Sequence, residues 1–188
     1  MKIISFKKQN KSGVSLVEVI ISTTIFVIIL LSMTGIFKMV LDAQRQAIAT
    51  QNVQESLKFF FEVISKEIRM AKRAGGGCAH LPANARFATS SNAFGEILYL
   101  KNYHDECVTY KLDDDNGVTR FYIERDSEGA WLSPRRVNVN DLQFFVHEVA
   151  GEQAYISISL DANYIGREAE HSRMRVQTTI TSRYYRPN

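Results

Sequence analysis

The side chains best suited to catalysis are scattered along the chain and form none of the common catalytic patterns. The four histidines share no metal-ligand spacing with one another: His80, His104, His147 and His171. There is no HExxH or CxxC motif and no GxSxG nucleophile elbow, and the glycines at 75–77 lack the GK[ST] ending of a phosphate-binding loop. The sequence therefore predicts that the chain is not an enzyme and needs no cofactor or catalytic metal.

Three consecutive aspartates are the densest group of possible metal ligands. Asp113, Asp114 and Asp115 precede Asn116-Gly117, and calcium prefers such hard oxygen ligands. Calcium takes about six to eight oxygens, however, and the spacing of an EF-hand with its distal glutamate is missing. Since Asn-Gly is typical of hairpins, we interpret the segment as a solvated turn between two strands.

One carboxylate is unusual because of its surroundings. Glu18 is the only charged residue from Val14 to Phe37, and a membrane span needs about 20 apolar residues. A carboxylate inside such a span is costly and usually marks function. Lysines, and no acidic residue, precede the stretch: Lys2, Lys7, Lys8 and Lys11. This charge pattern predicts a single-pass membrane protein with its N-terminus in the cytoplasm and the rest outside.

Two simpler explanations compete for this segment. A secretory signal peptide has an apolar region of about 7–15 residues and then a small-residue cleavage site. Here the apolar run is longer, and no such site follows it. A plain single-pass anchor accounts for length and orientation but leaves Glu18 unexplained. It stays open as an alternative.

The residues around Glu18 resemble the leader junction of type IV pilins and type II secretion pseudopilins. The run is Lys11-Ser12-Gly13-Val14-Ser15-Leu16-Val17-Glu18-Val19. It has a basic leader, a glycine, a glutamate five residues later and an uninterrupted apolar helix. The resemblance implies that a prepilin peptidase cuts after Gly13 and that the new amine of Val14 is methylated. The family usually has Phe at the position of Val14, so the chain departs from the family pattern there.

The same resemblance implies how subunits assemble. Cleavage creates an ammonium group at Val14, and Glu18 of a neighbouring subunit can neutralise it in an apolar phase. The implied partners are other pilin or pseudopilin subunits, the prepilin peptidase, an inner-membrane assembly platform and the membrane itself. The implied location is the inner membrane before assembly and a cell-surface or periplasmic filament afterwards.

The two cysteines, Cys78 and Cys107, both follow the apolar stretch. An even number of cysteines beyond a membrane crossing predicts one disulfide, with two unrelated buried thiols as the alternative. His104-Asp105-Glu106 stands directly before Cys107. We interpret this segment as a loop before a strand rather than a metal or thiol site.

A long helix must carry the segment that contains Glu18. From Val14 to Arg73 there is no proline and only one glycine, Gly35, which predicts a helix of about 90 Å if it is unbroken. An apolar stripe at steps of three and four marks its second half: Val53, Leu57, Phe60, Phe61, Ile64, Ile68 and Ala71. We expect this stripe, and Phe59-Phe60-Phe61 with it, to dock on a sheet rather than face a partner. Polar residues, Glu67 among them, fill the other positions, and we expect the glycines at 75–77 to end the helix.

The rest of the chain has the composition of strands. Short β-prone runs occur at 96–100, 107–112, 118–125, 137–139, 142–149, 155–160 and 173–184. In the last of these, apolar and polar residues alternate, so we expect it to be half exposed. The predicted fold class is α+β, a long N-terminal helix packed on a C-terminal antiparallel β-sheet head. The predicted divisions are a leader at 1–13, a transmembrane half at 14–37, an amphipathic half at 38–74 and a head at 75–188.

The head is similar, more loosely, to minor subunits of the PilW and type II secretion J-type kind. The similar elements are the strand-turn-strand Val108–Tyr122, the run Ser133-Pro134-Arg135-Arg136-Val137 that leads into Val139–Phe144, and the β-rich run Arg175–Arg183. This resemblance implies a minor structural subunit. A filament-tip adhesin or other binding module stays open as an alternative.

The charge balance argues against a nucleic-acid partner. The formal net charge is +3, and removal of residues 1–13 takes away four lysines and leaves −1. The remaining chain has no concentrated basic face of the kind that nucleic-acid binding requires.

Overall fold

The computed structural model describes residues 13–149, 152–167 and 170–183, and within them one helix is followed by antiparallel strands. The elements are α1 (Leu16–Met70), β1 (Phe87–Asn92), β2 (Gly95–Lys101), β3 (Cys107–Asp114), β4 (Thr119–Arg125), β5 (Glu128–Trp131), β6 (Val137–His147), β7 (Tyr155–Tyr164) and β8 (Arg173–Thr181). The predicted α+β class, a long N-terminal helix packed on antiparallel strands, is confirmed.

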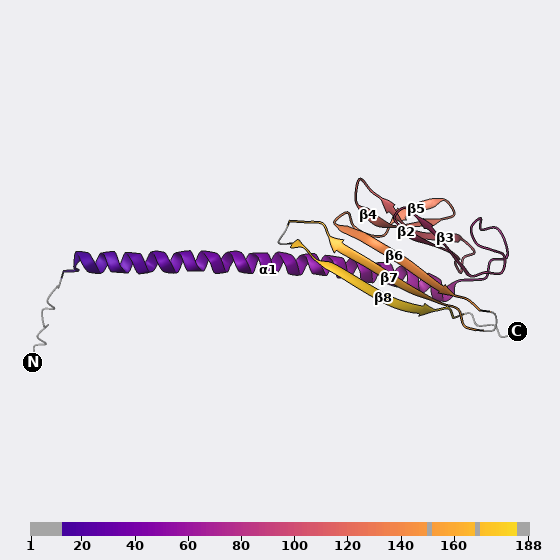
Figure 1. Cartoon of the computed structure of the whole chain (residues 1–188), viewed down its shortest axis with the longest axis horizontal. Coiled ribbons are helices and arrows are strands. Elements are labelled where there is room, and N and C mark those ends of the chain that lie inside the picture. Colours follow the sequence, from indigo (N-terminus) through magenta and orange to yellow (C-terminus); the bar gives the residue numbers. More distant parts are fainter. Residues whose placement is uncertain (1–12, 150–151, 168–169, 184–188) are drawn as a thin grey trace, which may run out of the picture. The chain divides into compact units, whose positions relative to one another are not determined.

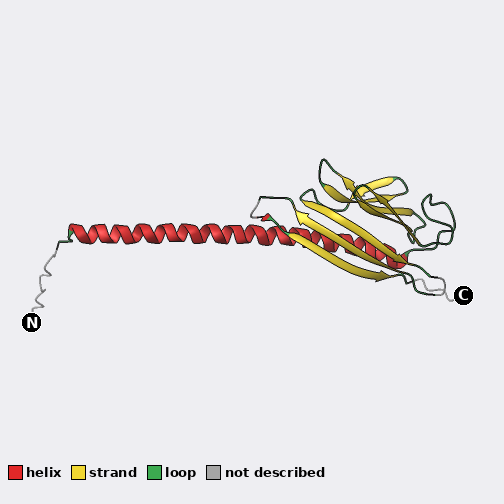
Figure 2. Cartoon of the chain, viewed as in Figure 1, coloured by secondary structure: helices red, strands yellow, loops and turns green. Residues whose placement is uncertain are grey.

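The chain divides into two compact units, Met1–Asp42 and Ala43–Asn188. The helix α1 contributes to both, whereas all the strands belong to the second unit (Figure 2). In the first unit, every residue from 13 to 40 is exposed. The buried core therefore lies in the second unit.

The strands form two sheets and not the single sheet that the sequence predicted. One has the order β1-β2-β3-β4-β5 and the other the order β6-β7-β8 (Figure 1). The sheets approach each other where β2 begins, because a side chain at Gly95 would come within 3.1 Å of the carbonyl oxygen of Leu142 in β6. Period-two alternation is the same in both sheets, so the sequence pattern contains no sign of the change from one to the other.

Several strands differ from the prediction, and β7, for example, continues to Tyr164, past the predicted end at 160. The predicted strands 137–139 and 142–149 are one strand, β6, with a register irregularity between Val139 and Asp141. The strands β1 and β5 were not predicted, since FATSSN and EGAW show no apolar alternation. The strand β8 ends at Thr181, and position 184 of the predicted run lies outside the described residues.

The apolar stripe of α1 forms the centre of the core, as predicted. All of its members except the half-buried Phe61 are buried. The ring of Phe60 stacks on Phe121 of β4 at 3.9 Å between centroids and meets the edge of Tyr110 of β3 at 6.3 Å. The predicted alternation of β8 is also confirmed, because its even-numbered side chains point inward.

The second half of α1 corrects the prediction at three points. The helix ends at Met70, before the glycines, because the backbone N–H of Lys72 donates to the carbonyl of Lys101 at 2.9 Å instead of continuing the helix. Phe59 is 51% exposed and does not belong to the core. Glu67, assigned to the polar side, is buried.

Candidate functional site

The predicted processing and assembly residues lie at the start of α1. Gly13 has no atom near the place where a side chain would project, and Val14 is 71% exposed. Glu18 lies in the first helical turn, exposed and without a hydrogen bond or ion pair to any described residue. Part of its stabilisation comes from the positive end of the helix dipole. The leader positions 1–12 lie outside the described residues.

The surface around Glu18 is apolar on all sides of the helix. Large exposed side chains include Leu16, Val17, Ile20, Ile21, Ile25, Phe26, Ile28, Leu31, Ile36 and Phe37. The helix is long and apolar enough to cross a membrane. A helix that is hydrophobic all round needs an apolar environment, which is compatible with a single-pass membrane protein.

Several hydroxyl side chains in this segment hydrogen-bond to the helix backbone. Thr24, Ser32 and Thr34 each donate to the carbonyl oxygen four residues earlier, at 2.8–2.9 Å. These bonds leave no hydroxyl donor of the three residues unpaired in an apolar phase. Glu18 therefore differs from these polar residues of the segment, because no described atom satisfies it.

The predicted disulfide between Cys78 and Cys107 is confirmed, with 5.6 Å between the Cα atoms. It joins the loop that follows α1 to the first residue of β3. The segment 104–106 is the loop before this strand, as predicted. The imidazole of His104 lies against the ring of Tyr103, with 3.6 Å between the ring centroids.

The predicted hairpin turn is confirmed, with Asp114, Asn116 and Gly117 exposed, but Asp115 is more buried than predicted. The side chain of Asp115 is 10% exposed and pairs with Arg135 at 2.9 Å and also with Arg120. Hydrogen bonds from Arg135 foremost, and from Arg120, lower the pKa of the Asp115 carboxyl despite its partial desolvation. Asp114 accepts a hydrogen bond from the backbone N–H of Gly117 at 3.0 Å. This pairing makes the turn a structural feature of the β3–β4 hairpin.

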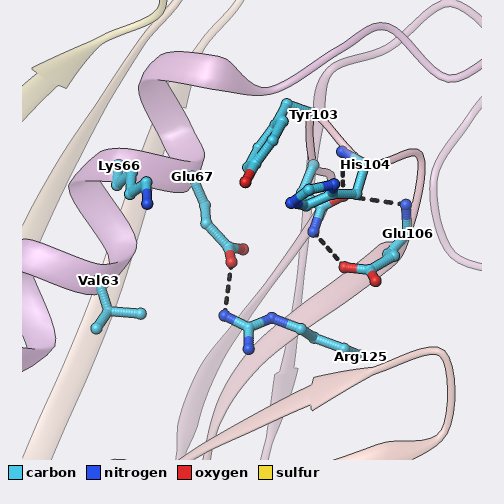
Figure 3. Close-up of a pocket in the computed structure, with 8 residues that line it drawn as sticks. Val63, Lys66, Glu67, Tyr103, His104, Glu106 and Arg125 are labelled. Carbon is cyan, nitrogen blue, oxygen red and sulfur yellow. Dashed lines mark hydrogen bonds and ion pairs between the residues drawn. The ribbon is translucent and has the colours of Figure 1, made fainter.

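An ion pair that the sequence did not predict lines a cavity of about 430 Å³ (Figure 3). Arg125 of β4 points toward Glu67 of α1, and its Nη2 donates to Oε1 at 2.6 Å. Tyr103 and His104 line the cavity from the β2–β3 loop. Helical spacing placed Glu67 next to the apolar stripe, but its partner is 58 residues away, so no local signal could have revealed the pair.

Comparison with known proteins adds no identification: no family model, no curated protein and no solved structure matches the chain.

Proposed function

We propose that this chain is a structural subunit of a type IV pilus-like or type II secretion pseudopilus filament. A prepilin peptidase cuts it between Gly13 and Val14, and it enters the filament from the membrane through α1. The compact, strand-rich head favours a minor subunit, which performs no catalysis. The head lies outside the cytoplasm, where the disulfide Cys78–Cys107 is stable.

The observation that carries the proposal is Glu18, an unpaired carboxylate on an exposed apolar helix. An isolated charge in an apolar phase is unfavourable, and so is the ammonium group that cleavage creates at Val14. When Glu18 of one subunit meets the Val14 amine of another, each charge satisfies the other. An uncut chain has no amine at this position, so processing and assembly are coupled.

The substitution Glu18→Ala tests this role. We expect Glu18→Ala and Glu18→Gln to insert and to be cut normally, because the junction at Gly13 is intact. We expect both to be depleted from the sheared filament fraction by about tenfold or more, since a buried amine without its counter-charge is strongly unfavourable.

Glu55→Ala serves as the matched control, because Glu55 is an exposed glutamate on the same helix whose contact is a hydrogen bond from Gln51 within α1. It should enter filaments normally. Wild-type incorporation of Glu18→Ala would contradict the pairing role.

A further inference from the structure

The strand β8 forms the outer edge of the three-stranded sheet (Figure 1). Among the described residues its only strand partner is β7, and every position from Arg173 to Thr181 pairs without a register shift. In an antiparallel pair, alternate residues bond to the neighbouring strand, and the residues between them direct their N–H and C=O groups to the other side. No described residue bonds to these outward groups of β8. The strand therefore presents a regular row of free backbone donors and acceptors.

The inner face of β8 is incompletely covered. Met174, Val176 and Thr178 point toward the core, yet all three are only half-buried. The inner residues of β7, one strand further into the sheet, are buried. A further strand beyond β8 would cover the exposed part of Met174 and Val176, and removal of apolar surface from water is favourable.

The other edges of the two sheets are covered, short or polar. At the edge of β6, the backbone N–H of Phe144 donates to the carboxylate of Glu96 from β2. A register irregularity between Val139 and Asp141 interrupts the same strand. In the five-stranded sheet, β5 has only four residues, all exposed, and β1 buries only Phe87. Such features protect sheet edges, whereas β8 has no proline, no irregularity and no charged residue on its inner face.

The two faces of β8 define the kind of segment that fits its edge. The outer side chains are polar, and Arg173 and Arg175 among them are paired with Asp161. A strand beside β8 thus needs apolar side chains on the inner face and polar ones on the outer face, in strict alternation. Peptides that add a strand to a sheet edge gain affinity from backbone hydrogen bonds and specificity from such alternate side chains.

The direction of β8 argues against a second copy of this chain. The backbone N–H of Arg183, two residues after β8, donates to the carbonyl of Arg69 near the end of α1. The strand therefore runs in the same direction as the second half of α1 (Figure 1). Antiparallel pairing of two β8 strands relates the copies by a two-fold axis and reverses one head relative to the other. Subunits that enter one filament from one membrane carry their heads in the same orientation, so this pairing does not fit.

We propose that the free edge of β8 binds an extended strand of a different subunit of the same filament, which joins the sheet antiparallel to β8. The inference rests on the proposed function, because the partner is a neighbouring filament subunit. It gives a minor subunit a specific place beside one partner, since the apolar surface of α1 is uniform and does not fix the register between heads.

Amide hydrogen exchange of the full chain in detergent tests the edge directly. The probe is a synthetic peptide with the sequence of β7, Tyr155–Tyr164, because this strand already pairs with β8 and has the required alternation. We expect the peptide to slow the exchange of those β8 amides that do not bond to β7 by at least about tenfold, because each gains a hydrogen bond. A peptide of the same composition with its apolar residues grouped together should have no effect.

Two substitutions in β8 test the geometry. Thr178→Lys places a charge on the inner face, which is how natural edge strands prevent pairing, so we expect it to abolish the protection by the peptide. The matched control is Gln177→Lys, at the neighbouring position on the exposed outer face, which should keep the protection. Urea unfolding followed by Trp131 fluorescence checks that both variants fold. If Thr178→Lys fails to fold, the two peptides with the wild-type chain still decide.

Filament recovery tests the identity of the partner. We expect Thr178→Lys to be cut after Gly13 but to be depleted from the sheared filament fraction by about tenfold or more. Gln177→Lys should be recovered like wild type. The purified wild-type chain should be monomeric in detergent, because its own β8 edges do not pair with each other.

The outcomes separate the edge, its partner and the proposed function. No protection by the β7 peptide, equal protection by the grouped peptide, or protection retained in Thr178→Lys each overturns the edge. Wild-type dimers that Thr178→Lys abolishes, or normal filament recovery of folded Thr178→Lys, overturn the different subunit as partner. An uncut wild-type chain overturns the proposed function and the filament partner with it, whereas peptide binding is scored independently of cleavage.

Discussion

Glu67 is a charged residue among the apolar residues of the core. Its Oε1 accepts from Arg125, while its Oε2 and the hydroxyl of Tyr110 are buried with no hydrogen-bond partner in the described residues. Burial foremost, and then the negative charge of Glu67, raises the pKa of Tyr110. Burying a charge is costly unless its partner is held in place. Removal of one partner should therefore lower the stability of the fold more than replacement of both partners by apolar residues.

A double-mutant cycle measures this difference. We expect Arg125→Leu alone to lower the free energy of unfolding by about 2–3 kcal/mol, because it leaves Glu67 without a counter-charge. Glu67→Leu combined with Arg125→Leu should cost less than the single change. The single tryptophan, Trp131, reports urea unfolding of the full chain in detergent. A double variant that loses more stability than Arg125→Leu would contradict this account.

A second buried acid, Asp161 of β7, is fully paired. Arg173 of β8 donates to both of its carboxylate oxygens at 2.8 Å, and Arg175 and Asn140 donate as well. These bonds, foremost the one from Arg173, lower the pKa of Asp161 from 3.8 to about 2. Its folded-state pKa is thus below its unfolded value. The charged form stabilises the fold above about pH 4, and this contribution is lost as the pH falls toward 2.

The pH dependence of unfolding tests the role of Asp161. We expect wild type to exceed Asp161→Asn in stability at neutral pH, and this difference to shrink by up to about 2 kcal/mol between about pH 5 and pH 2. Asp114→Asn is a control, since Asp114 is exposed in the β3–β4 turn. A difference that stays constant with pH would contradict the assignment.

At the scale of the elements, the disulfide holds the loop between α1 and β1 against the sheet. It contains Gly76 and Gly77, both at positive φ, and it begins where Lys72 pairs with Lys101. The disulfide joins this loop to β3 across 29 residues of sequence. Closing a chain segment of this length restricts the unfolded state and stabilises the folded one.

Removal of the disulfide should therefore weaken the head measurably. We expect Cys78→Ser with Cys107→Ser to lower the free energy of unfolding by about 3–4 kcal/mol, with α1 retained by circular dichroism. Reduction of wild type should have the same effect. A loss below about 1 kcal/mol would show that hydrogen bonds of the loop, such as Ala74 N–H to the Ala85 carbonyl, already hold it.

Local periodicity explains which elements the sequence predicts well. The stripe of α1 and the strands β3, β4 and β8 follow from spacing alone. The strand β5 pairs locally with β4, but it is exposed and has no apolar alternation that would predict it. The division into two sheets depends on pairing between distant residues, which single-sequence patterns do not contain. The ion pair Glu67–Arg125 escaped prediction for the same reason. The disulfide was predictable because only two cysteines exist.

At the scale of the whole molecule, the surface that requires an apolar partner is the exposed first part of α1. The first unit exposes an apolar helix with one unpaired carboxylate, Glu18. A filament subunit would bury this helix among other helices, where Glu18 meets a counter-charge. A plain anchored domain needs only the apolar helix and a membrane.

Mass spectrometry of the chain expressed with and without an active prepilin peptidase tests the central claim most directly. The account predicts that the peptidase produces a chain that begins at Val14, with a methyl group on its new amine, and that Gly13→Ala lowers this cleavage. An intact wild-type N-terminus in the presence of the active peptidase would contradict the filament assignment and favour the plain membrane anchor.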